Sequence, residues 1–94
     1  MTKFRGGGQI GRTISSWPFV ALDISDDEIR LSIVLEEVTL KKENIVKVEF
    51  KKGLLASKII FKHSNPLLKI NIQFWTFSPD SVMNEIRARG YPTA

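Results

Sequence analysis

The sequence contains no cysteine and a single histidine, His63. Without cysteine the chain has neither disulfides nor thiolate metal ligands, and this absence fits any redox compartment. His63 stands in a turn-forming segment, His63-Ser64-Asn65-Pro66, and no carboxylate lies within nine residues of it. Metal sites and acid–base catalysis both need several such groups together. We therefore predict no metal, no cofactor, no catalytic residue and no enzymatic activity.

The chain also lacks long apolar runs. None of its apolar segments approaches the roughly 20 residues that a membrane-spanning helix requires. Its beginning, MTKFRGGGQIG, has no apolar central region of the kind found in secretory signals. We expect a cytoplasmic protein, with peripheral membrane contact as the alternative.

Acidic residues are missing from two long stretches. Residues 1–22 carry Lys3, Arg5 and Arg12 and no acid, and residues 50–78 carry five lysines and no acid. The segment between them carries eight acids against four bases. A basic surface favours an anionic partner, such as phosphate, a lipid headgroup or an acidic protein. Lysines on a sheet can also serve only to keep its edges from pairing with other chains.

Short alternating apolar segments separated by tight polar turns predict an antiparallel sheet. The expected strands cover residues 17–24, 29–35, 38–40, 45–52, 57–62 and 67–75, with a short additional strand at residues 10–14. We expect residues 1–9 to form a flexible N-terminal lead, because they are terminal and rich in glycine. The Gly6-Gly7-Gly8 run is not a phosphate loop, because no predicted strand precedes it and no Gly-Lys-Ser/Thr follows it.

A helix follows the last strand, in the segment SPDSVMNEIRARG at about residues 79–89. Ser78 and Pro79 suit its beginning, and Gly90 suits a left-handed residue after its end. Its apolar residues form a narrow stripe that must lie on the sheet: Val82, Met83 and Ile86. Short strands cannot cover their own inner face, so the sheet must curl. We predict a mainly β (β+α) protein: a strongly bent antiparallel barrel of six to seven strands closed by one C-terminal α-helix.

The order of these elements resembles the pleckstrin-homology-like (PH-like) superfold, which includes GRAM domains and small uncharacterised bacterial PH-like proteins. The resemblance covers roughly residues 10–91 and rests on the segments WPFVALDISDDEIRLSI, VTLKKENIVKVEF and QFWTFSPDSVMNEIRARGYP. It implies a bent barrel of seven strands with a helix at one corner. Many members of this superfold bind protein partners or assemble into rings, and the length of the chain predicts one such domain, here residues 10–94.

PH domains that bind phosphoinositides place lysine and arginine around their first hairpin. The loop that we assign to that hairpin reads Ser25-Asp26-Asp27-Glu28, and Arg30 is the nearest cation beyond it. Three carboxylates at this place would repel a phosphate. We therefore do not expect the usual headgroup site.

A row of lysines is the best candidate for contact with an anionic partner. These residues, which we call the lysine face, fall on the outward phase of three strands that we expect to be adjacent: Lys47, Lys51, Lys58, Lys62 and Lys69. Glu49 dilutes their charge, and the row can equally be an ordinary solvated face. Nucleic-acid-binding sheets place several exposed aromatics among such lysines, whereas only Trp75 is expected here. We therefore do not expect nucleic acid as a partner.

Trp17 begins one predicted strand and Trp75 ends another, so both should lie near the ends of the barrel. Each can pack over the rim of the core or serve as an aromatic contact for a protein partner. The function we expect is a non-catalytic PH-like binding or assembly module, acting by protein–protein contact or self-association. The alternative is electrostatic binding to anionic membrane lipids through the lysine face. No small-molecule substrate is evident.

Overall fold

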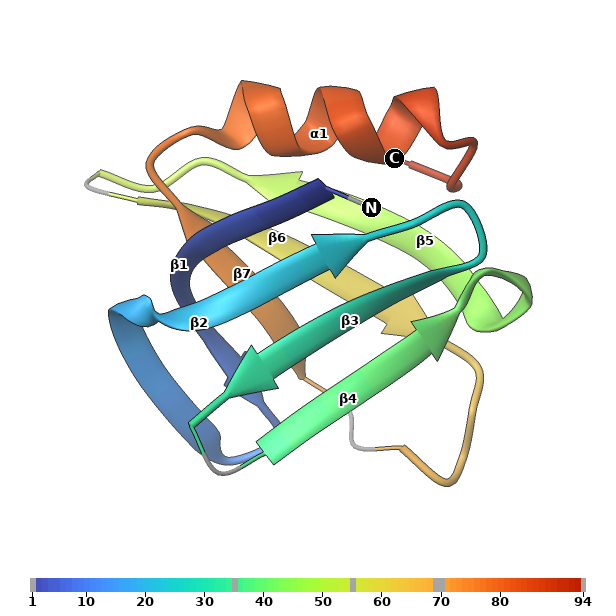
Figure 1. Ribbon diagram of the computed structural model, residues 1–94, viewed down its shortest axis with the longest axis horizontal. Coiled ribbons are helices and arrows are strands. Elements are labelled where there is room, and N and C mark those ends of the chain that lie inside the picture. Colours follow the sequence, from blue (N-terminus) through green and yellow to red (C-terminus); the bar gives the residue numbers. More distant parts are fainter. Residues whose placement is uncertain (1, 35, 55, 69–70, 94) are drawn as a thin grey trace.

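The computed structural model describes residues 2–34, 36–54, 56–68 and 71–93 (Figure 1). The strands are β1 (Thr2–Ile10), β2 (Thr13–Ile24), β3 (Glu28–Ile33), β4 (Glu36–Lys41), β5 (Ile45–Lys51), β6 (Ser57–His63) and β7 (Ile72–Thr76). A short 3-10 helix, η1 (Lys42–Asn44), precedes β5, and the helix α1 (Pro79–Ala88) follows β7. No helix in the described part of the chain is long and apolar enough to cross a membrane.

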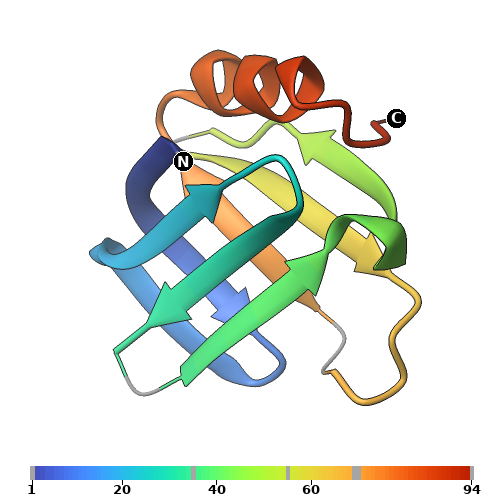
Figure 2. The ribbon, with the colours of Figure 1, turned by 45° about the vertical axis from the view of Figure 1, so that its right-hand side comes forward.

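All seven strands belong to one sheet in the order β4-β3-β2-β1-β7-β6-β5, and the recorded strand pairings are antiparallel. The sheet curls so strongly that its two wings, the strands β4-β3-β2 on one side of β1 and β7-β6-β5 on the other, face each other. Helix α1 lies across one open end (Figures 1 and 2). The predicted fold class is therefore confirmed: a mainly β protein whose bent antiparallel sheet is accompanied by one C-terminal helix.

Strand β1 lies at the centre of the sheet, and the prediction of a flexible lead is wrong for residues 2–9. Its first half pairs with β2, from Thr2 to Gly6, and its second half pairs with both β2 and β7. Glycine is required where β1 passes from one wing to the other. A Cβ on Gly6 would lie 2.3 Å from the carbonyl oxygen of Trp75, and one on Gly8 would lie 2.6 Å from that of Gln73. The glycines therefore allow close backbone approach rather than disorder.

The core fills the space between the two wings and α1. The alternation read from the sequence is confirmed in β7, where Ile72 and Phe74 are fully buried, and in α1, whose apolar stripe is buried. Phe50 lies directly opposite the fully buried Ile59 and so belongs to the inner face, but it remains 41% exposed near the end of an edge strand. Burial of these side chains stabilises the curled sheet by removing apolar surface from water.

Polar contacts fasten the end of α1 to the loop between β2 and β3. Arg89 pairs with Glu85 at 2.6 Å and with Asp26 at 2.9 Å. The Tyr91 hydroxyl donates to the carbonyl oxygen of Ser25 at 2.7 Å, and the Lys42 ammonium donates to the carbonyl oxygen of Arg89. We call Lys42, Glu85, Arg89 and Tyr91 the C-terminal clasp. Burial is the main cause that raises the pKa of Tyr91 to about 12.

Candidate functional site

The first hairpin of the structure is β1–β2, and its turn consists of Gly11 and Arg12. The acidic loop Ser25-Asp26-Asp27-Glu28, which the sequence pattern assigns to the first hairpin, joins β2 to β3 instead. The error follows from the missed strand β1. The carboxylates of the β2–β3 loop therefore carry no argument about a phosphate at the β1–β2 turn.

A large irregular bulge in β2 shapes the outer surface next to this hairpin. Gly6 is opposite Val20 and Gly8 is opposite Ser15, so the segment 16–19 of β2 stands opposite the single residue Gly7. A proline in this segment fits such an interruption, because it cannot donate to the ladder. Trp17 and Phe19 lie in the bulge and are 57% and 59% exposed.

Trp75 lies on the outer face of β7, beside this bulge. A Cβ on Gly7 would lie 3.1 Å from the Trp75 ring and 3.2 Å from the backbone nitrogen of Trp17, so the missing side chain leaves room for the ring. The indole N–H of Trp75 donates to the side-chain oxygen of Gln73 at 3.0 Å. Because its polar atom is satisfied within the chain, the half-buried ring presents apolar surface.

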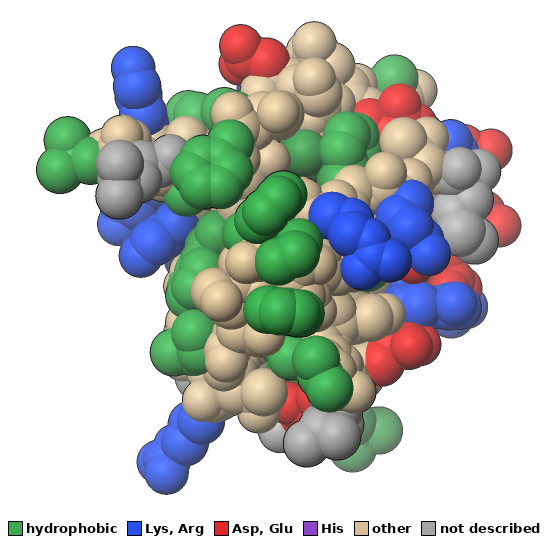
Figure 3. All heavy atoms as spheres, turned by 60° about the vertical axis from the view of Figure 1, so that its left-hand side comes forward, with side chains coloured by type: hydrophobic (Ala, Val, Ile, Leu, Met, Phe, Trp, Pro, Cys, Tyr) green, Lys and Arg blue, Asp and Glu red, His purple; other side chains and the backbone are tan. Residues whose placement is uncertain are grey.

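We call the residues that share this surface the apolar band: Ile14, Trp17, Phe19 and Trp75. Ile14 joins it from the outer face of β2, where it pairs with Gln9 and is 60% exposed. Figure 3 shows hydrophobic side chains gathered into a band on this side of the molecule, with basic side chains on both flanks. The structure thus brings the two predicted contact aromatics, Trp17 and Trp75, to one surface.

The lysine face lies next to this band, on the outer surface of β5 and β6. Lys47 is directly opposite Lys62, and Lys51 is directly opposite Lys58. The strands β5, β6 and β7 are neighbours in the sheet, as predicted. The fifth predicted member, Lys69, lies outside the described residues.

Glu49 divides the lysine face into two unequal parts. Its carboxylate pairs with Lys62 at 3.3 Å and with Lys47 at 3.7 Å. These contacts, above all the hydrogen bond from Lys62, hold the pKa of Glu49 below its ordinary value. Lys51 and Lys58 have no ion pair within the described part of the chain; the Lys58 ammonium lies 5.9 Å from the centre of the Trp75 ring. The uncompensated charge of this surface is therefore concentrated next to the apolar band.

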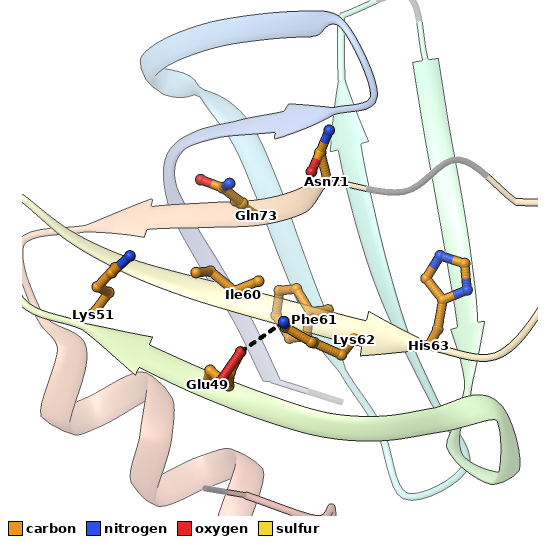
Figure 4. Close-up of a pocket in the computed structure, with 8 residues that line it drawn as sticks. All are labelled: Glu49, Lys51, Ile60, Phe61, Lys62, His63, Asn71 and Gln73. Atoms are coloured by element: carbon orange, nitrogen blue, oxygen red, sulfur yellow. Dashed lines mark ion pairs between the residues drawn. The ribbon is translucent and has the colours of Figure 1, made fainter.

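A hollow of about 400 Å³ occupies the outer surface between β5, β6 and β7 (Figure 4). Its lining mixes two lysines, two amides, one carboxylate, one imidazole and two apolar side chains: Glu49, Lys51, Ile60, Phe61, Lys62, His63, Asn71 and Gln73. Figure 4 shows Glu49 and Lys62 joined across the strands in the middle of the hollow, with Lys51 toward one end and His63 toward the other. The volume falls within the range of ligand pockets, but the polar groups are spread along the hollow rather than converging on one point.

The imidazole in this lining takes part in the turn after β6, because the Nδ1 atom of His63 accepts a hydrogen bond from the backbone N–H of Asn65 at 3.2 Å. Over residues 2–34, 36–54, 56–68 and 71–93 there is no group of three or more histidine or acidic side chains placed to hold a metal ion.

No protein family, curated protein or solved structure matches this chain.

Sequence reasoning missed two members of the apolar band, Ile14 and Phe19. The signal that could have revealed them is Pro18, because a proline within an apparent strand indicates an edge or a bulge. A bulge here breaks the simple alternation and turns apolar side chains outward. The opposition of Lys51 and Lys58 could not be read from the sequence, because the register depends on the length and geometry of the turn.

Proposed function

We propose that this chain is a non-catalytic, PH-like binding and assembly module that works in the cytoplasm and contacts protein through the apolar band. A second copy of the chain is the partner that we propose first. The order of seven strands followed by one helix supports the PH-like part of the proposal. The single observation that carries the binding part is the exposure of Trp17 and Phe19 beside Trp75.

Exposed aromatic side chains suit protein contact for a physical reason. They bring a large apolar area with few rotatable bonds, so ordering them at an interface costs little entropy. Tryptophan is among the residues most often found where binding energy is concentrated. Here the bulge of β2 holds Trp17 outward, and Gly7 leaves room for Trp75 beside it.

Sedimentation velocity over a dilution series tests this proposal. We expect the wild-type chain to form a defined oligomer, and the double variant Trp17→Gln/Phe19→Gln to remain a monomer at the same concentrations. Leu67→Gln is the matched control, because Leu67 is 91% exposed and lies outside the apolar band. A wild-type chain that stays monomeric at every concentration contradicts the proposal, and so does a double variant that associates like the wild type.

A second candidate is electrostatic binding to an anionic membrane. The observation that favours it is the uncompensated charge of Lys51 and Lys58, which lies beside aromatic side chains suited to a membrane interface. Co-sedimentation with vesicles of phosphatidylserine and phosphatidylcholine separates the two candidates. A monomer that pellets with these vesicles at low salt, and is released at moderate salt, supports the membrane instead of the protein partner.

A further inference from the structure

The pair Lys51 and Lys58 is an unusual arrangement within a sheet. Two like charges directly opposite each other in antiparallel strands lower the stability of the pairing. Glu49 relieves the neighbouring pair of lysines, but residues 50–78 contain no acid that could relieve this one. The folded monomer therefore carries two adjacent cations at the end of β5 and the start of β6, next to Trp75.

The opposite end of the molecule carries two acidic side chains, Asp27 and Glu43. Both are exposed, and neither has an ion pair within the described part of the chain. Of the two lysines that lie with them, Lys41 makes its ion pair with Glu28 at 2.8 Å, and Lys42 belongs to the C-terminal clasp. Asp27 and Glu43 act on Lys41 only as more distant charges, which add to the effect of Glu28 in raising its pKa. These four side chains line a hollow of about 430 Å³: Asp27, Lys41, Lys42 and Glu43.

An apolar side chain accompanies these carboxylates, as aromatic side chains accompany the lysines. Val46, at the start of β5 and three residues after Glu43, is 61% exposed. One end of the molecule thus combines cations with aromatic surface, and the other combines two carboxylates and two lysines with an aliphatic side chain. The charges without an ion pair are opposite in sign at the two ends, and each end offers apolar surface.

The two ends cannot meet within one chain. Strand β5 runs from one to the other, beginning next to η1 and ending at Lys51, so the two sets of charges lie at opposite ends of the ribbon (Figure 1). They can meet only between molecules. A contact between two different patches is heterologous, and its repetition gives a closed ring or an open filament.

We propose that copies of this chain associate head to tail, with Lys51 and Lys58 of one copy receiving Asp27 and Glu43 of the next. The apolar band lies beside this contact and packs against the surface around Val46. The inference rests on the proposed function, because it names the partner and the orientation of the contact that the apolar band makes. It supplies carboxylate partners to Lys51 and Lys58, which have no ion pair within the described part of the chain.

Charge reversal tests this contact with the protein itself as the probe. One variant carries Lys51→Glu/Lys58→Glu, and a second carries Asp27→Lys/Glu43→Lys. Each should raise the dissociation constant of self-association by about tenfold or more, because like charges then face each other across the interface. An equimolar mixture of the two should associate again, because each reversed end regains an opposite partner. Arg12→Glu/Arg87→Glu changes the net charge as much as the first variant but at exposed sites outside both ends, and should leave association unchanged.

The mixture separates a lost contact from a lost fold, because unfolded variants cannot restore each other. Association of both reversed variants at the wild-type strength overturns the head-to-tail contact. If Trp17→Gln/Phe19→Gln still dissociates the oligomer in that case, the proposed function stands and only the orientation is wrong. A wild-type chain that is monomeric at every concentration overturns both. A monomer that binds phosphatidylserine vesicles, and loses that binding with Lys51→Glu/Lys58→Glu, assigns these lysines to a membrane instead.

Discussion

The outer face of the sheet uses charge differently on its two wings. On β3 and β4, Arg30 lies between Glu28 and Glu37 at 3.3 Å from each, and Glu28 also pairs with Lys41 at 2.8 Å. On β5 and β6, by contrast, lysine stands opposite lysine, and Glu49 offsets only one of the two pairs.

This difference separates charge that supports the fold from charge that is available for contact. The surface ion pairs of β3 and β4 each add little stability, but they give the cations of that wing partners within the molecule. Unpaired lysines of the second kind lower the stability of their strands and attract an anionic surface. Strand β1 joins the two wings, so the comparison depends on its close packing.

The largest effect should come from breaking that junction with Gly6→Val. The added side chain collides with the carbonyl oxygen of Trp75, for which a Cβ at this position would already be 2.3 Å away. We expect the free energy of unfolding to fall by about 3 kcal/mol, as in other overpacked sites. Urea denaturation measures this, with Ala21→Val on the outer face of β2 as a control that should cost much less. An unchanged midpoint would mean that β1 does not join the wings as described.

Alkaline pH should weaken the C-terminal clasp, in which Tyr91 and Arg89 contact the acidic loop between β2 and β3. Tyr91 keeps its proton to a pKa of about 12 in the folded chain, whereas an unfolded tyrosine loses it near its ordinary value of 10.0. The unfolded state therefore binds fewer protons above pH 10, and stability falls as the pH rises toward 12. Thermal unfolding across this window should show a smaller fall for Tyr91→Phe than for the wild type. Equal slopes would contradict the assigned burial of the phenol.

Reversing one unpaired lysine should stabilise the monomer. Lys51→Glu places a carboxylate opposite Lys58 and should raise the free energy of unfolding by about 0.5 kcal/mol. Lys52→Glu is the matched control, because it makes the same change in net charge just beyond the end of β5 and should have almost no effect. Chemical denaturation of both variants at low salt measures the difference. A loss of stability in Lys51→Glu would remove the contrast between the wings.

The smallest expected effect is a loss of stability, from a substitution on the wing that contains β3 and β4. Arg30→Gln removes the cation shared by Glu28 and Glu37, so we expect a slight fall in the unfolding temperature that disappears at high salt. The comparison is sharpest when this variant and Lys51→Glu are measured together. Shifts of the same sign would show that the two wings do not differ in their use of charge.

Much of this architecture could be predicted from local patterns. The alternation in 72–75 and the apolar stripe of α1 confirm that half-buried elements reveal their inner face in the sequence. Strand β1 could not be found in this way, because Gly6, Gly7 and Gly8 are favoured there by close backbone approach, which only the folded sheet creates. The outward position of Phe19 depends on a bulge, and the opposition of Lys51 and Lys58 depends on register. Both are properties of strand pairing, which local patterns do not contain.

The most direct measurement of the central claim is a dilution series followed by two-dimensional NMR of the backbone amides. Self-association through the proposed surfaces predicts concentration-dependent shifts at the apolar band and at both charged ends: Ile14, Trp17, Phe19, Asp27, Glu43, Lys51, Lys58 and Trp75. The first part of β4, residues 36–39, lies away from both ends and should show none. Shifts that are confined to residues 36–39, or the absence of any shift with concentration, would contradict the account.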